Sequence, residues 1–257
     1  MILARALRAA ARRAAEPGGL RFTERQLYYE LCRVLRPYHL GPRRWGYTVR
    51  PPVSYSAFRA ALAEAGPVPG LLPPAAPRRG VGLHTAEPDL FDYGLPRLLV
   101  CESTEVAGML RANGIEAESA CPVVAAAELP LDPRVVGMLE IGGGTVYALH
   151  DATPAGMDFP ATLAVGVPVV ALGLRPRQAW SLHLTRGRGP AGRPGAGLSD
   201  VEGRWFGAGR FVEVEAVGPA SLLRTVHRLV REVRPRRDGW ASWTGWRRSG
   251  FLTWPQG

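Results

Sequence analysis

The stretch VYALHDATPAG, from Val146 to Gly156, decides the expected fold. It begins with a short apolar run, and such runs bounded by turn residues are typical of strands buried on both faces of a sheet. The run leads into Asp151, and Pro154 and Gly156 then indicate a sharp turn. The stretch therefore predicts a carboxylate at the tip of a buried strand, where α/β sheets hold their ligands.

A second segment has the same pattern of an apolar run followed by a carboxylate. Residues 98–101 form another apolar run, which ends directly on Glu102 and is followed by a helix expected over 104–113. In a parallel sheet the carboxyl ends of neighbouring strands lie at one edge, so Glu102 and Asp151 are expected to converge on one divalent cation although forty-nine positions separate them.

These two segments resemble the Toprim fold of topoisomerases, primases and some nucleases. The nearest resemblance is to the topoisomerase VI A subunit and its relatives that make meiotic double-strand breaks, where the later motif reads approximately Asp-x-Asp-Pro-x-Gly. Asp151, Pro154 and Gly156 match that motif, and Thr153 stands where the second Asp is found. The resemblance implies Mg²⁺ or Mn²⁺ held by Glu102, Asp151 and Thr153.

Thr153 departs from the family pattern, because a hydroxyl is a neutral ligand in place of a carboxylate. Mg²⁺ keeps several waters and needs few protein ligands, so Glu102 and Asp151 are expected to suffice with weaker affinity. Asp158 is an alternative source of the missing charge, although it follows the turn.

A helix is expected over residues 23–36, with Thr23 and Gln26 forming a capping box. Within it, RQLYY resembles the Arg-x-x-Tyr-Tyr motif of the same family, which implies that Tyr29 is the nucleophile. Helical geometry places Tyr28 at the margin of the apolar stripe and Tyr29 away from it, on a basic face with three arginines. That face would favour the phenolate, although stacking of a surface tyrosine on arginine is the alternative reading. The three arginines are Arg25, Arg33 and Arg36.

The N-terminal third has the layout of a winged helix. Helices are expected over 2–15, 23–36 and 57–65, the last capped by Ser54 or Ser56, and residues 66–73 are the expected wing. DNA contacts are assigned to Arg25, Arg33 and Arg36 on the second helix and to Arg59 on the third. The predicted organisation is a winged-helix-like domain (1–80), a linker (81–96), a Toprim-like domain (97–230) and an Arg/Trp-rich tail (231–257).

The predicted fold class is α/β, a Toprim-like, mainly parallel sheet flanked by helices and preceded by the small helical domain. Beyond the acidic motif, the pattern predicts a buried strand over 165–172, a loop over 187–197, a half-exposed strand over 211–217 and a helix over 220–234.

The charge balance favours an acidic partner. The chain has 32 basic and 22 acidic residues, a net charge of +10, and every basic residue is Arg. Arginine binds phosphate bidentately, which favours DNA, although a GC-rich genome would also enrich Arg. Without Lys there is no standard Walker A loop, so an ATP-driven step would need a separate ATPase subunit.

Three separate cysteines, Cys32, Cys101 and Cys121, lack metal spacing and are expected to be reduced, buried thiols. The longest apolar run, 159–174, is interrupted by prolines and too short to span a bilayer. We therefore expect no membrane partner and a cytoplasmic, nucleoid-associated protein.

Three functions fit these features. The first is a DNA-cleaving transesterase in which Tyr29 attacks a phosphate with metal at Glu102 and Asp151; family resemblance then implies a homodimer, with the tyrosine of one subunit acting at the site of the other. The second is a Toprim nuclease in which water attacks and Tyr29 only binds. The third is a DNA-binding or scaffold subunit whose cleavage site has degenerated at Thr153.

Overall fold

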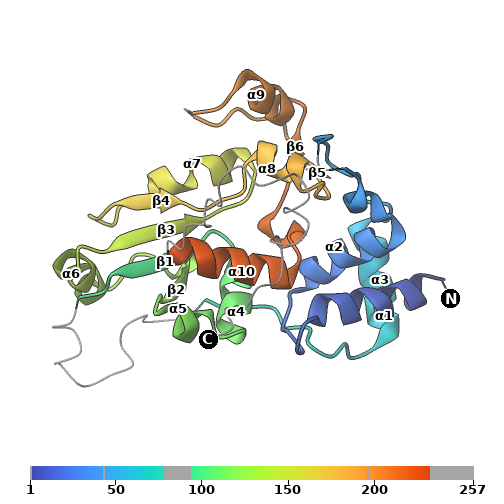
Figure 1. Cartoon of the computed structure of the whole chain (residues 1–257), viewed down its shortest axis with the longest axis horizontal. Helices are drawn as coiled ribbons and strands as arrows, with labels where there is room; N and C mark the ends of the chain where they lie inside the picture. The colour runs from blue at the N-terminus through green and yellow to red at the C-terminus, as the bar shows by residue number, and fades with distance from the viewer. Residues whose placement is uncertain (1, 43, 78–93, 196, 232–257) are drawn as a thin grey trace, which may run out of the picture.

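The computed structural model describes residues 2–42, 44–77, 94–195 and 197–231. Its main body is a four-stranded parallel sheet with helices on both faces, joined to a group of N-terminal helices (Figure 1). The strands of the main sheet are β1 (Arg97–Cys101), β2 (Val123–Ala125), β3 (Thr145–Leu149) and β4 (Val169–Ala171). A second sheet pairs β5 (Gly187–Arg188) with β6 (Arg210–Phe211). The α/β class and the flanked parallel sheet are confirmed.

The strand order is β2-β1-β3-β4, so the two strands that precede the acidic residues are central neighbours. Their register pairs Cys101 with Leu149. Alternate residues of β1 belong to different cores: Leu98 and Val100 face one side, and Leu99 and Cys101 face the other. Two-sided burial explains why both strands read as continuous apolar runs.

Helices close both faces of the sheet. The core that contains Leu99 also includes residues of α4, α5 and α10 and of the N-terminal helices, whereas the opposite core is covered by α6 and α7. These helices are α4 (Thr104–Ala112), α5 (Ile115–Ser119), α6 (Pro133–Ile141), α7 (Pro154–Thr162) and α10 (Pro219–Val230). The remaining elements are η3 (Ala126–Glu128), α8 (Pro176–Ser181), α9 (Asp200–Gly207) and η4 (Val214–Ala216).

The N-terminal helices form where the sequence places them: α1 (Ile2–Ala15), α2 (Glu24–Leu35) and α3 (Tyr55–Ala65), with η1 (Pro37–Leu40) after α2. The capping box is confirmed, because Thr23 accepts from the Gln26 N–H and the Gln26 side chain accepts from the Thr23 N–H. Ser54 caps α3. The expected wing is not a hairpin: around residue 71 the described structure has one isolated parallel bridge, Phe22 to Leu71.

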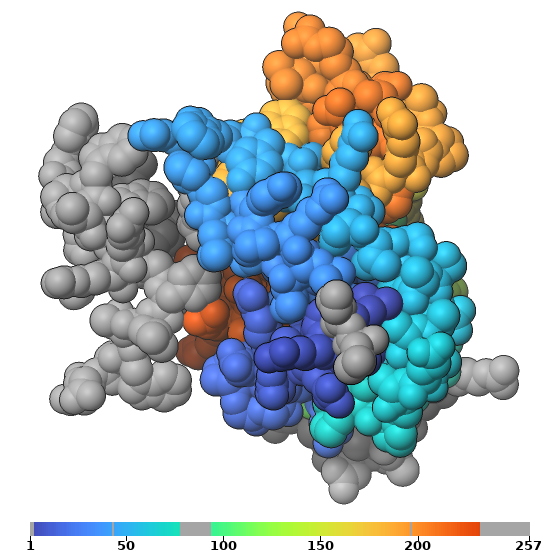
Figure 2. All heavy atoms as spheres, turned by 90° about the vertical axis from the view of Figure 1, so that its right-hand side faces the viewer, coloured from blue at the N-terminus to red at the C-terminus, as the bar shows by residue number. Residues whose placement is uncertain are grey.

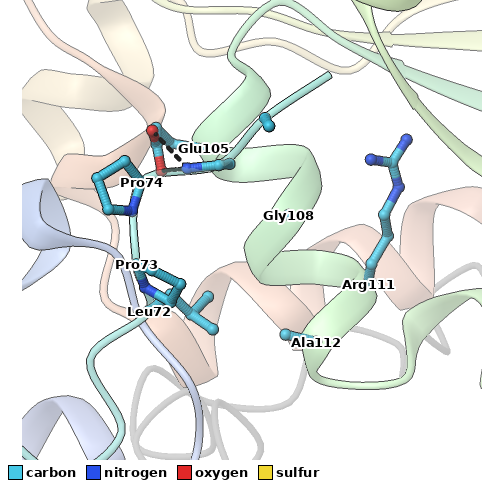
Figure 3. Close-up of a pocket in the computed structure, with 9 residues that line it drawn as sticks. Leu72, Pro73, Pro74, Glu105, Gly108, Arg111 and Ala112 are labelled. Carbon is cyan, nitrogen blue, oxygen red and sulfur yellow. Dashed lines mark hydrogen bonds between the residues drawn. The ribbon is translucent and has the colours of Figure 1, made fainter. Parts of the chain in front are cut away.

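A short segment after the helical group, 72–76, lies across α4. Figure 3 shows Glu105 turned back to this segment, where both of its carboxylate oxygens accept from the Ala75 N–H at 3.0 and 3.1 Å. Gly108 permits the crossing, because a Cβ there would lie 3.2 Å from the Cβ of Ala75. Glu105 therefore holds the connection in place.

Two expected strands were wrong. Residues 165–172 give only β4, an edge strand with Val170 43% exposed, instead of a buried strand. In the expected strand over 211–217, Phe211 ends β6 and residues 214–216 form a 3-10 turn, η4. The helix expected over 220–234 is present as α10, which ends at Val230 with Arg231 as its C-cap. Residues 232–257, and with them nearly all of the predicted tail, lie outside the described residues.

The three cysteines are free and buried, as expected. Within the described ranges, every helix is too short or too polar to cross a bilayer.

Candidate functional site

Glu102 and Asp151 meet at the tips of β1 and β3, as predicted. The Glu102 N–H donates to the Leu149 carbonyl at 2.9 Å, which continues the β1–β3 pairing by one residue. The Asp151 N–H then donates to Oε2 of Glu102, also at 2.9 Å. A contact between residues forty-nine positions apart thus follows from the parallel register of two neighbouring strands.

Asp151 is fixed by a segment that the sequence reading did not assign to the site. Ala152 and Val212 form an antiparallel bridge, and the Val214 N–H donates to Oδ1 of Asp151 at 2.6 Å. Burial raises the pKa of Asp151 to about 7; the Val214 N–H opposes this, and Glu102 and Glu213 add to it. Near neutral pH the carboxyl group can therefore exchange a proton, as an acid or base catalyst must.

Thr153 has a structural function at the same turn. It is the N-cap of α7, and its Oγ1 accepts from the Gly156 N–H at 2.8 Å. Gly156 leaves space for the acidic groups, since a Cβ there would come within 2.8 Å of Glu102 Oε2 and 2.9 Å of Thr153 Oγ1.

These residues can be tested against the Mg²⁺ that the resemblance implies. Glu102 and Asp151 each use one carboxylate oxygen to accept a backbone N–H, and for the second oxygen of each no hydrogen bond is found with another described residue. Across the described ranges no three His, Cys, Asp or Glu side chains are grouped as metal ligands. Two carboxylates at a turn lined by a hydroxyl fit Mg²⁺, which usually retains several waters.

Tyr29 is brought to the same site from α2. Its hydroxyl donates to Oε2 of Glu213 at 2.7 Å, and Glu213 directly precedes the residue that binds Asp151. Only 3% of Tyr29 is exposed. The expected solvent-facing, basic surroundings were wrong: burial, followed by Glu213, raises the pKa of Tyr29 well above its usual value.

A second glutamate of the same segment completes an acidic group. Glu215 is buried, and its Oε1 accepts from the Thr23 hydroxyl at 2.6 Å. Burial raises the pKa of Glu215 to about 7; the Thr23 hydroxyl lowers it, and Glu213 raises it further. We refer to the four carboxylates that influence one another here as the acidic cluster: Glu102, Asp151, Glu213 and Glu215.

The four arginines assigned to DNA binding have different surroundings. Arg25 lies 3.8 Å from Glu213 and 4.1 Å above the ring of Tyr55. Burial lowers its pKa, but Glu213 and the nearby tyrosines raise it by more. Arg33 is bound internally to Glu30 and to the Ala216 carbonyl, which separates it from any surface role.

The other two arginines are exposed. Arg36 caps the end of α2, and Arg59 lies 3.3 Å from Glu24. Among the neighbouring candidates, Tyr28 packs against Tyr55 and Phe58, as its place near the apolar stripe indicated.

His150 and Asp158 lie at the margins of the site. The His150 side chain is buried, its Nδ1 lies 2.9 Å from the Asp151 carbonyl, and its ring occupies the space beside Gly173. Asp158 accepts from the Gly195 N–H at 2.8 Å. Because its carboxylate is bound to that loop, Asp158 does not replace the carboxylate that is missing at position 153.

Glu213 and Glu215 are the residues of the candidate site that the sequence did not predict. Their signal was the alternation VEVEA, which we interpreted as a half-exposed strand rather than as two acidic side chains turned towards α2.

Comparison of the chain with protein-family models, curated proteins and solved structures finds no match.

Proposed function

We propose that this protein binds DNA and cleaves phosphodiester bonds at the tips of β1 and β3. One observation supports this above the others: two adjacent residues of one segment, Glu213 and Val214, join Tyr29 to Asp151 through hydrogen bonds. Tyr29 is thus linked through residues 213 and 214 to Asp151, and Asp151 is bonded to Glu102, which supports one site built from separate parts of the chain.

The residues support hydrolysis by water better than attack by tyrosine. Attack requires a phenol oxygen that can reach phosphorus, and Tyr29 is buried, protonated and hydrogen-bonded to Glu213. Asp151 and Glu102 each keep one carboxylate oxygen for which no hydrogen bond to a described residue is found, so these two oxygens can hold a metal ion and its waters. Glu102 and Asp151 would hold a Mg²⁺ ion, which supplies charge neutralisation at the phosphate when bound.

Transesterification by Tyr29 is the second candidate, and Glu213 favours it. Its carboxylate lies 2.7 Å from the phenol oxygen and is placed to accept the proton that the tyrosine would lose on attacking phosphorus. This reaction needs the contact between α2 and residues 213–216 to open. It does not need a second subunit to supply the tyrosine, because Tyr29 already lies at the acidic site of its own chain.

The decisive experiment is cleavage of supercoiled plasmid with Mg²⁺ or Mn²⁺ by wild type, Asp151→Ala and Tyr29→Phe, with Asp158→Ala as an exposed-carboxylate control. Hydrolysis predicts nicking that is lost in Asp151→Ala, persists in Tyr29→Phe and leaves no protein attached to DNA. Transesterification predicts a covalent protein–DNA adduct that Tyr29→Phe abolishes. DNA binding without cleavage under either metal would refute both mechanisms and favour the scaffold function.

A further inference from the structure

A groove outside the acidic site combines arginines with aromatic rings. It holds about 530 Å³ between residues 46–48, α8, α9 and β6. The lining residues that matter are Tyr47, Trp180, Arg186, Arg204, Trp205 and Arg210. In Figure 2 the light-blue segment that contains residue 47 lies against the yellow and orange segments that carry the rest of this wall.

Backbone contacts fix the walls of this groove. The Tyr47 N–H donates to the Trp180 carbonyl at 3.2 Å. The Val49 N–H donates to the Leu184 carbonyl at 3.0 Å and the Arg186 N–H donates to the Val49 carbonyl at 2.9 Å, which makes the parallel bridge between Val49 and Thr185. The Tyr47 ring stacks on His183 with a centroid separation of 4.0 Å. The groove is thus formed before any ligand arrives, which reduces the ordering cost of binding.

The charge in the groove is positive and uncompensated. Arg186, Arg204 and Arg210 line it, and none of them forms an ion pair with another described residue. Burial lowers the pKa of Arg186, and the neighbouring guanidinium groups of Arg210, Arg50 and Arg188 lower it further. Such a group of like charges is relieved by a polyanion, because each phosphate can neutralise an arginine.

The aromatic side chains supply a second, independent feature. Trp180 and Trp205 meet edge to face at 6.4 Å, and Trp180 is a half-buried residue that lines the groove. Trp205 is 3% exposed, and its Nε1 has no hydrogen-bond acceptor among the described residues. A buried donor without a partner is costly, so the fold leaves one polar group of this wall unsatisfied.

We propose that this groove binds a single-stranded nucleic-acid segment, with Arg186 and Arg210 contacting phosphates and a base stacking on Trp180. Arginines beside exposed rings are the recognition mode of single strands, because unpaired bases offer their faces and duplex bases do not. The inference rests on the nucleic-acid binding proposed above and is independent of cleavage.

The groove and the acidic site share one segment of the chain, residues 210–214. Arg210 precedes Glu213 by three residues, so their Cα atoms are at most about 11 Å apart along the extended chain. Between them, Val212 is bridged to Ala152 beside Asp151. Residues 210–214 therefore carry both an arginine of the groove and the backbone N–H that binds Asp151.

The test is fluorescence anisotropy of a labelled single strand of roughly 15 nucleotides and of the matching duplex, in EDTA to prevent cleavage. The variants are Arg186→Gln/Arg210→Gln and Trp180→Ala; the matched control is Arg5→Gln/Arg8→Gln, two exposed arginines of α1. Circular dichroism confirms folding of each.

We expect the arginine pair to weaken single-strand binding about tenfold and to lower the salt slope by about 1.4, because each phosphate contact contributes about 0.7. Trp180→Ala should weaken it about fivefold or more. The control should bind as wild type does.

Equal loss in the α1 control, unchanged affinity in the groove variants or preference for duplex would overturn the groove assignment alone. Absence of any nucleic-acid binding by wild type would overturn the proposed function with it. Retained binding in Asp151→Ala, together with lost binding in the groove variant, would show that the two sites act separately.

Discussion

Glu215→Gln should stabilise the protein at alkaline pH. The substitution keeps the size of a side chain that is 7% exposed, and the amide oxygen can still accept from the Thr23 hydroxyl. Glu215 has a pKa of about 7 in the folded protein, against an ordinary value of 4.5. At 1.36 kcal/mol per pKa unit, ionising it in the folded state costs up to about 3 kcal/mol.

The sign of the effect follows from proton linkage. Because the folded-state pKa is raised, folding binds the proton, and the contribution of Glu215 to stability is complete below about pH 4.5. It is lost as the pH rises through about 7. The glutamine stays neutral throughout, so its advantage over wild type should grow from near zero at pH 4.5 to about 3 kcal/mol at pH 8.

The measurement is the free energy of unfolding from urea titrations followed by circular dichroism at several pH values between these limits. Glu64→Gln is the control, because it makes the same chemical change at an exposed position on α3, where charges contribute little. Comparing each variant with wild type at the same pH removes the contribution of other titrating groups. A variant that loses stability at pH 8, or that shows the same difference from wild type at every pH, would refute this account of Glu215.

Three further substitutions test particular contacts. Tyr29→Phe should cost about 1–2 kcal/mol in urea titrations, because it leaves Glu213 without the phenol donor; no loss would argue against that hydrogen bond. Arg111→Met should lower the free energy of unfolding by about 3–5 kcal/mol in the same assay, since it leaves the buried Glu128 carboxylate without its ion-pair partner; an unchanged free energy of unfolding would contradict the ion pair. Thr153→Asp should keep the α7 cap, as Asp is also a good N-cap, and should increase the rise in melting temperature caused by Mg²⁺, by calorimetry; an unchanged response would remove residue 153 from the metal site.

The strand tips were predictable from sequence because two properties coincided there. Each strand is buried on both faces, which produces an uninterrupted apolar run, and each run is followed within two residues by a carboxylate. Parallel pairing then brings Glu102 and Asp151 together without any further information. The Thr23 cap was equally local, since its partner Gln26 lies within one helical turn.

The surroundings of Tyr29 were not predictable in this way. Helical periodicity shows that Tyr29 faces a different direction from Leu27 and Leu31, but it does not show what packs on that face. The covering residues, 213–216, lie about 184 positions further along the chain, and their alternation is compatible with a strand. The groove was not predictable from the sequence either, because its walls come from several short segments that are far apart in the chain.

The acidic cluster and the arginine groove carry opposite charges, and we therefore expect them to have different functions. Four carboxylates lie around the strand tips, and Arg25 is the arginine that approaches them most closely in the described ion pairs. A phosphodiester would be repelled there unless the carboxylates were neutralised, and the raised pKa values of Asp151 and Glu215 show that the fold favours protons at these positions. The arginine groove attracts phosphate with no such requirement. DNA binding should therefore persist in EDTA and weaken with salt, whereas cleavage should require a divalent cation that takes the place of those protons.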